Sequence, residues 1–251
     1  MGQNFLIDPA IPYEIAESSR ANEQNGVLEI GPGIGALSHE LCERAGKVVA
    51  VELDKTLLPI LDETMARFDN FEVVSANILK TDIPTLVKEK FAGLTPIVCA
   101  NLPYYITSPI VMKLVQKEVA ERLCAAPGTS AYGAFSVFMQ YYTEPEYLFA
   151  VPRECFEPQP KVTSAVLRAV VRREPPVEVE DEKFFFRVVY AAFALRRKTL
   201  VNSLMTAFGS QLTKEQVTQA VISCGLEANI RGERLGLSEF AALSAEIAAL
   251  L

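Results

Sequence analysis

A short polar segment near the middle of the chain has the residue types needed for chemistry on a planar amine. The apolar run 97–99 predicts a buried strand that ends at Asn101, and Pro103 cannot continue a sheet ladder, so a turn follows. The side-chain carbonyl of Asn101 and the backbone carbonyl of Leu102 can accept both hydrogens of an exocyclic amino group, while Tyr104 covers the ring face. Two acceptors would turn the amine lone pair toward an electrophile. The alternative is an ordinary strand–turn–helix junction in which the asparagine is a cap.

The elements that must position this segment alternate between strand and helix in the first half of the chain. Short β-rich runs occupy residues 27–31, 47–52, 71–75 and 96–100, and helical patterns occupy 35–45 and 55–67. This alternation predicts an α/β domain with a mostly parallel sheet and helices on both faces. We expect another helix after residue 107, because Ile110, Val111, Leu114 and Val115 recur at helical spacing.

The second half of the chain changes character near residue 176. A helix to about Tyr142 precedes two further strands, 147–151 and 164–171, and residues 174–176 read as a linker. From about residue 182 the pattern is entirely helical, with helix starts at Thr213 and Ser238. We therefore expect a catalytic domain over residues 1–176 and a small all-helical domain over 177–251.

A glycine-rich turn follows the first β-rich run. Its spacing is Gly31-x-Gly33-x-Gly35, Glu29 precedes it, and Glu52 ends the second run 21 residues after Gly31. A carboxylate at that position commonly accepts hydrogen bonds from ribose hydroxyls. Dinucleotide sites instead use G-x-G-x-x-G, and an acid beside the turn would repel a pyrophosphate. S-adenosylmethionine, which carries a sulfonium and an ammonium, fits better than a dinucleotide; a turn without a ligand is the remaining alternative.

Composition excludes several classes of protein. No run of 18 apolar residues and no signal-peptide pattern occurs, so neither a membrane span nor a secretory signal is expected. The five cysteines are scattered without metal-ligand spacing, which favours a reduced cytoplasmic protein without a metal. A net charge of −7 argues against a broadly basic surface, although cations gather in residues 153–173 and 196–198. The lone His39 suits a surface or packing role.

Six motifs in order along nearly the whole chain resemble those of the ribosomal RNA adenine dimethyltransferases, the class that modifies small-subunit rRNA near its 3′ end. The matching segments are Gly2–Leu6, Glu29–Gly33, Val51–Asp54, Asn101–Ile106, Phe156–Val166 and Arg196–Leu200. Each motif is weak or moderate alone, but the set is highly specific.

The resemblance implies a class I methyltransferase domain, with a Rossmann-like, mostly parallel sheet, and a helical C-terminal domain. It implies that S-adenosylmethionine is bound by Asn4, Leu6, Gly31, Glu52 and Asn101, to which the turn adds Glu29, Gly33 and Gly35. Asn77 follows the third strand where the family usually has aspartate, and its carbonyl can still accept a hydrogen bond from an adenine amino group. Phe156 matches an aromatic residue that stacks on the target base opposite Tyr104; without the family, it reads as a core residue.

The resemblance also implies the reaction: methyl transfer to N6 of two adjacent adenines in the 3′-terminal hairpin loop of 16S rRNA, in an immature 30S particle. The expected catalytic residues are Asn101, Leu102, Pro103, Tyr104 and Phe156. Expected RNA contacts are Arg153, Lys161, Arg196, Arg197 and Lys198, with a charged helix face that packs against the other domain as the alternative reading of the last three. We expect a cytoplasmic monomer with no membrane partner.

Three alternatives stay open. A large-subunit rRNA adenine methyltransferase of the macrolide-resistance type shares the Asn-x-Pro-Tyr chemistry, although Leu102 and the 196–200 element favour the small subunit. A non-catalytic RNA-binding assembly or transcription factor could keep the same fold. A dinucleotide oxidoreductase is remote, because no hydride-transfer acid or base can be nominated. Family members carry a basic segment before Gly2, so we expect a trimmed N-terminus and a lower affinity for RNA.

Overall fold

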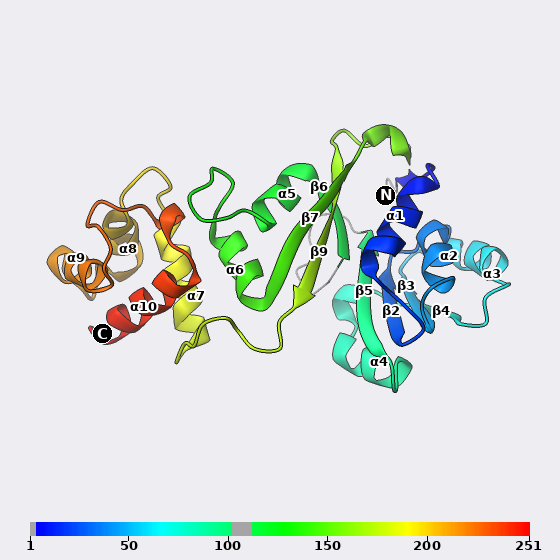
Figure 1. The fold of residues 1–251 in the computed structure, drawn as a ribbon, viewed down its shortest axis with the longest axis horizontal. Helices are drawn as coiled ribbons and strands as arrows, with labels where there is room; N and C mark the ends of the chain where they lie inside the picture. The colour runs from blue at the N-terminus through cyan, green and yellow to red at the C-terminus, as the bar shows by residue number, and fades with distance from the viewer. Residues whose placement is uncertain (1–3, 102–111) are drawn as a thin grey trace. The chain divides into compact units, whose positions relative to one another are not determined.

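The computed structural model describes residues 4–101 and 112–251 of the chain (Figure 1). Its packing divides the chain into two compact units. The first comprises Met1–Ala120 and Glu146–Val170, and the second comprises Glu121–Pro145 and Val171–Leu251.

A seven-stranded sheet forms the centre of the first unit (Figure 1). Across the sheet the order is β4 (Phe71–Ser75), β3 (Lys47–Glu52), β2 (Asn25–Ile30), β5 (Thr95–Asn101), β6 (Met112–Gln116), β9 (Ser164–Val171) and β7 (Thr143–Val151). The first five strands are parallel, and β9 runs antiparallel to β6. The predicted mostly parallel sheet is therefore present.

Helices cover both faces of this sheet because successive strand residues point to opposite sides. On one face Val27 and Val48 pack in a core with α1 (Ala10–Ser19), α2 (Ala36–Cys42) and α3 (Leu58–Thr64). On the other face Leu28 and Val49 pack with residues of α4 (Ile83–Lys90). Short 3-10 turns lie at Lys55–Leu57, Ile78–Lys80 and Arg153–Cys155.

The expected helix after residue 107 is wrong over residues 112–116, which form strand β6. This strand pairs in parallel with β5, and the helix that follows, α5 (Lys117–Leu123), begins only at Lys117. A short apolar run fits a fully buried strand as well as a helix, and periodicity alone does not separate them. Pairing on both sides, with β5 and with β9, decides the outcome here.

A separate two-stranded sheet joins segments far apart in the sequence. β1 (Phe5–Leu6) pairs antiparallel with β8 (Phe156–Glu157), with Leu6 opposite Phe156. The ladder continues where the Ile7 N–H donates to the Cys155 carbonyl at 2.9 Å. The N-terminal motif and the Phe156 motif are thus held together.

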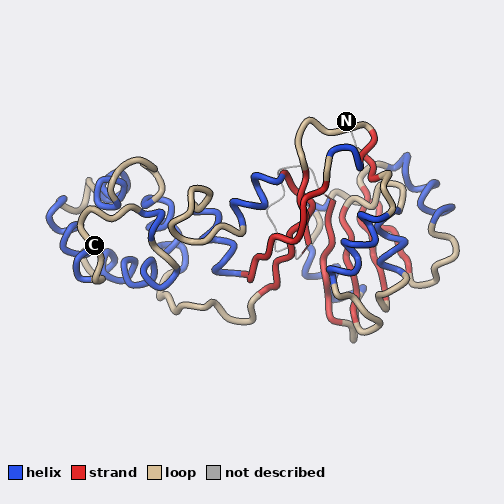
Figure 2. Tube along the Cα trace, turned by 45° about the horizontal axis from the view of Figure 1, so that its top comes forward, coloured by secondary structure: helices blue, strands red, loops and turns tan. Residues whose placement is uncertain are grey.

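The second unit is helical from residue 182 onward (Figure 2). Its helices are α6 (Ala134–Tyr142), α7 (Glu182–Ala192), α8 (Leu200–Phe208), α9 (Lys214–Ser223) and α10 (Leu237–Ala248), with a 3-10 turn at Gly232–Arg234. Sequence placed the boundary between domains at 176/177, whereas residues 121–145 pack with this unit. Aromatic contacts explain the difference, because Tyr141 of α6 lies against Phe185 and Phe186 of α7.

One of the two predicted helix starts is placed as expected. Thr213 caps α9, and its hydroxyl accepts from the Gln216 N–H. The N-cap of helix α10 is Gly236, two residues before the predicted Ser238, and the Glu239 carboxylate accepts from the Gly236 N–H at 3.0 Å. Among the helices of the described ranges, none has the length and apolar character to cross a bilayer.

Candidate functional site

The order of the sheet reverses between β2 and β5. The chain runs outward from β2 through β3 to β4 and then returns to place β5 on the other side of β2. Ile30 pairs with Ala100, so the next residues at this carboxyl edge are Gly31 and Asn101. Ligands of open α/β sheets bind at such a reversal. The remainder of the predicted catalytic segment, Leu102, Pro103 and Tyr104, lies outside the described residues.

The glycine turn after β2 has a backbone that other residues adopt only with strain. Gly31, Gly33 and Gly35 have φ angles of 71°, 62° and 93°. The turn is anchored where the Gly31 N–H donates to the Val51 carbonyl at 3.0 Å, and Gly35 is the N-cap of α2. Left-handed backbone favours glycine, and the missing side chains leave the turn open to close approach by a ligand.

Glu52 ends β3 at the same edge and is only 3% exposed. One carboxylate oxygen, Oε1, accepts from the Asp54 N–H at 2.8 Å. The other, Oε2, is buried without a hydrogen-bond partner among the described residues. Since buried polar atoms are normally paired, this oxygen has a free acceptor position that ribose hydroxyl groups of a cofactor would fill.

Glu29 is the second acidic residue near this edge of the sheet; it lies one residue before the end of β2 and is 2% exposed. The Ser38 hydroxyl of α2 donates to Glu29 Oε2 at 2.6 Å. Burial raises the pKa of Glu29 to about 7; the Ser38 hydrogen bond opposes this rise, and the charge of Glu52 adds to it. Sequence reasoning named Glu29 but missed Ser38, whose spacing of nine residues from Glu29 has no recognisable signal.

Asn77 follows β4 and performs the local role of a turn asparagine. Its Oδ1 accepts from the Leu79 N–H at 3.0 Å and so caps the 3-10 turn Ile78–Lys80. A carbonyl oxygen has two lone pairs, so this bond leaves one acceptor position on Asn77.

Three of the predicted site residues lie in or next to the β1–β8 sheet, but in different environments: Asn4, Leu6 and Phe156. Asn4 is exposed and Leu6 is half-buried, whereas Phe156 is 3% exposed in the core beside Val151 and Val166. The expected stacking surface on Phe156 is not available in this structure, because the core encloses its ring. Here Phe156 is the core residue that the sequence offered as the alternative.

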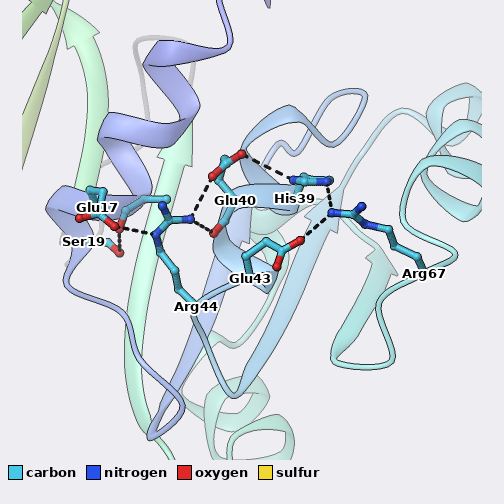
Figure 3. A network of polar contacts seen from close by, with 8 residues as sticks. Glu17, Ser19, His39, Glu40, Glu43, Arg44 and Arg67 are labelled. Carbon is cyan, nitrogen blue, oxygen red and sulfur yellow. Dashed lines mark hydrogen bonds and ion pairs between the residues drawn. The ribbon is translucent and has the colours of Figure 1, made fainter.

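A network of charged side chains connects α1, α2 and the segment that follows α3 (Figure 3). Arg44 donates to Glu17 of α1 at 3.1 Å and to Glu40 of α2 at 3.0 Å. Arg67, which follows α3, donates to Glu43 at 2.6 Å. Sequence reasoning missed this network, although Glu40 and Arg44 stand at the i, i+4 spacing of a helical ion pair.

His39 has the packing role expected for it. Its ring lies edge-on to Phe68, with the ring centroids 5.0 Å apart, and its Nε2 meets the Arg67 guanidinium. No cluster of possible metal ligands occurs within 4–101 and 112–251.

The predicted RNA-contacting cations are exposed, but two of them have partners. Arg153 donates to Glu154 at 3.1 Å, and Arg196 donates to the Ser130 carbonyl. Arg197 and Lys198 are exposed in the turn between α7 and α8, and Lys161 is exposed before β9. The alternative of a charged helix face does not apply to residues 196–198, since they lie in a turn.

Comparison with known proteins decides the family. A family model described as ribosomal RNA adenine dimethylase matches residues 1–246. The chain belongs to the ribosomal RNA adenine dimethylase family. It is 48% identical to ribosomal RNA small subunit methyltransferase A of Geobacillus sp. strain WCH70 over 259 residues, covering 97% of this chain and 89% of the relative. The protein of the same name from Bacillus cereus strain B4264 is 47% identical, with the same coverage.

Solved structures confirm the fold expected of this family. A dimethyladenosine transferase from Plasmodium falciparum superposes with a TM-score of 0.81 at 21% identity, over 98% of both chains. The 23S rRNA methyltransferase ErmE superposes with a TM-score of 0.73 at 24% identity, over 97% of this chain and 99% of that one. The fold is thus that of a class I methyltransferase with a helical C-terminal region, as the motifs predicted.

Family membership identifies the cofactor as S-adenosylmethionine, and the edge of the sheet fits it. The turn has three glycines at positive φ, the buried Oε2 of Glu52 has no donor among the described residues, and Glu29 and Glu52 form an acidic environment for a cation. These features match a ligand with ribose hydroxyls and positive charge.

Proposed function

We propose that this chain transfers methyl groups from S-adenosylmethionine to N6 of two adjacent adenines in the 3′-terminal hairpin loop of small-subunit rRNA, giving N6,N6-dimethyladenosines during assembly of the 30S particle. The observation that carries the proposal is the register of β2 and β5, which sets Asn101 beside the glycine turn at the reversal of the sheet. Membership of the dimethylase family, with relatives named for the small subunit, supports the choice of substrate.

In the cofactor site, Glu52 is the proposed acceptor for the ribose hydroxyls, and Asn77 is the proposed acceptor for the adenine amino group. Gly31, Gly33 and Gly35 admit the amino acid end, beside Asn4, Leu6 and Glu29. When bound, S-adenosylmethionine supplies an electrophilic methyl group on its sulfonium. The protein's contribution is then to hold the acceptor nitrogen in line with that carbon, and positioning of this kind supplies most of the catalysis.

For the target adenine, the proposed acceptors are the side-chain carbonyl of Asn101 and the backbone carbonyl of Leu102. They hold both amino hydrogens and favour a nitrogen whose lone pair is free to attack. Tyr104 is the proposed stacking partner of the base, and Pro103 completes the proposed catalytic motif. Stacking offsets the cost of taking the base out of the RNA stack, with about 1–3 kcal/mol per base. After attack the methylated nitrogen loses a proton to water, so no general base is required.

For RNA binding, Arg153, Lys161, Arg196, Arg197 and Lys198 are the proposed phosphate contacts. Three consecutive cations in the exposed turn between α7 and α8 suit a polyanion, because each contact releases a counterion from the RNA. We propose that the protein acts as a monomer and, given its ribosomal substrate, in the cytoplasm.

The decisive experiment is mass spectrometry of rRNA from unmodified 30S particles after incubation with the protein and labelled S-adenosylmethionine. The expected result is four labelled methyl groups on two adjacent adenines near the 3′ end, because each of the two receives two. Parallel reactions with 50S particles test the large-subunit alternative. Label confined to 23S rRNA, or absent from both subunits, would contradict the proposal.

A further inference from the structure

Glu29 is a buried carboxyl group near the carboxyl end of β2. It is held by Ser38, itself fully buried, through the 2.6 Å hydrogen bond from the hydroxyl to Oε2. The other titratable groups that act on it or are acted on by it are Cys42 on α2, Cys99 on β5 and Glu52 on β3. These elements pack around the end of β2.

Among the residues whose side chains the structure describes, no lysine, arginine or histidine forms an ion pair with Glu29 or Glu52. Burial, to which the charge of Glu29 adds, raises the pKa of the Cys42 thiol to about 12 and also raises the pKa of the Cys99 thiol, so both thiols stay neutral. Buried carboxylates without a counterion favour either a proton or a cationic ligand.

The methyl donor and its product differ in the charge that would meet this environment. S-adenosylmethionine carries a sulfonium that S-adenosylhomocysteine lacks, while the amino, carboxyl, ribose and adenine groups are the same in both. In the transfer, the sulfur–carbon bond breaks, the nitrogen–carbon bond forms, and the sulfur keeps the bonding electron pair and becomes neutral. The positive charge therefore leaves the cofactor with the methyl group, and the methylated nitrogen then loses a proton to water.

We propose that Glu29, positioned by Ser38 and next to Glu52, discriminates S-adenosylmethionine from S-adenosylhomocysteine by charge: the ionised carboxylate favours the cationic donor, and its protonation removes that preference. This inference rests on the proposed function. It assigns a specificity-determining role to Glu29 and a positioning role to Ser38. Product release is then promoted, because S-adenosylhomocysteine has no sulfonium to balance the negative charges of Glu29 and Glu52.

Since the pKa of Glu29 is raised to about 7, the preference is expected to change across neutral pH. Calorimetric titration of the full chain with each ligand, at pH 6 and pH 8.5, measures the ratio of the two dissociation constants. We expect the preference for S-adenosylmethionine to increase about tenfold over this interval, the scale of a charge–charge interaction in a partly buried site. Because both ligands share their other ionisable groups, the ratio of the dissociation constants reports the contribution of the sulfonium charge to binding.

Three variants make the test specific. Glu29→Gln keeps the shape of the side chain and should make the ratio independent of pH. Ser38→Ala removes the hydrogen bond that opposes the rise in the Glu29 pKa, so the rise in preference should move to higher pH. Glu63→Gln, at an exposed carboxyl on α3, is the matched control and should behave as the parent chain does.

The outcomes separate the two proposals. If both ligands bind but the parent chain shows a constant ratio, or if Glu29→Gln keeps the pH dependence, the role of Glu29 is wrong while the proposed function stands. If neither ligand binds at any pH, the proposed function fails and this inference fails with it.

Discussion

The ring of Phe5 in the N-terminal strand lies beside Gly33 of the glycine turn. A Cβ atom built on Gly33 would be 3.4 Å from Phe5 Cδ1, and Phe5 is itself held by its pairing with Glu157. The N-terminal motif therefore forms one wall of the turn that is proposed to receive the cofactor. This contact explains how a motif at the start of the chain belongs to the same site as a turn that begins 26 residues after Phe5.

Replacing Gly33 with alanine should weaken cofactor binding as well as stability. At a φ of 62° a Cβ costs about 1–2 kcal/mol, and here it would lie in van der Waals contact with the ring of Phe5. Gly93→Ala is the matched control, because Gly93 has a φ of 82° and open space around its Cβ position. Both variants should lose similar stability in thermal denaturation, and only Gly33→Ala should lose affinity in calorimetry. Equal affinities would show that the turn does not contact the cofactor.

Glu52→Gln should lower affinity for S-adenosylhomocysteine about 10- to 100-fold. Hydrogen bonds to a charged acceptor contribute about 1.5–3 kcal/mol, and the amide removes one acceptor oxygen. Stability should hold or increase, because the amide removes a negative charge that is buried without an ion-pair partner among the described residues. Glu72→Gln on β4, where the carboxylate pairs with Lys47 and Lys90, is the control and should leave affinity unchanged. Unaltered binding by Glu52→Gln would rule out its contact with ribose.

Asn101→Ala should reduce methyl transfer about 10²–10³-fold, the typical loss when one preorganised hydrogen-bonding group is removed from an active site. Cofactor affinity and the thermal transition should largely survive, which separates a catalytic defect from misfolding. Asn70→Ala provides the comparison, since the Asn70 amide donates to the Cys42 and Ala45 carbonyls at the amino ends of the strands. That variant should lose stability but not turnover. Near-normal turnover in Asn101→Ala would remove the central catalytic assignment.

Stability should decrease from pH 5 to pH 8 because of Glu29. Folding raises the pKa of this carboxyl from 4.5 to about 7, so the folded chain binds more protons between these values. Its contribution to stability is complete below pH 4.5 and is lost as pH rises to 7, a change of about 3 kcal/mol. Urea unfolding should show a smaller decrease for Glu29→Gln, which should be the more stable form at pH 8. Parallel curves for the two chains would contradict this account.

Neutralising Arg196, Arg197 and Lys198 to glutamine should weaken RNA binding and flatten its dependence on salt. Loss of three phosphate contacts reduces the slope of log K against log salt by about 2–3. The double variant Lys88→Gln, Lys214→Gln removes exposed cations elsewhere and should leave the slope unchanged. Filter binding over a salt series measures both. An unchanged slope in the triple variant would exclude these residues from the RNA interface.

The parts of the fold that the sequence predicted are those in which local pattern and tertiary structure agree. The β-rich runs that end at Gly31 and Glu52 are strands, and the glycines between strand and helix do adopt the backbone that only glycine adopts readily. These features depend on residues that are close together in the chain, so they can be predicted from the sequence alone.

The errors arise where a distant partner decides the structure. Residues 112–116 form a strand because β5 and β9 pair with them, and Phe156 is enclosed because β1 and the core reach it from elsewhere. The contact between Ser38 and Glu29 likewise depends on how α2 lies on the sheet. None of these relations has a signal in local spacing.

The position of β9 between β6 and β7 has a consequence for synthesis of the chain. Because translation proceeds from the N-terminus, β6 leaves the ribosome with one side paired to β5 and the other open until Val171 has emerged. Until then the nascent polypeptide presents an unpaired strand edge, which is a site for aggregation. Truncated products that stop before residue 164 are therefore expected to depend on chaperones, although they already include β2, β3, β4 and β5, which end at the proposed cofactor site.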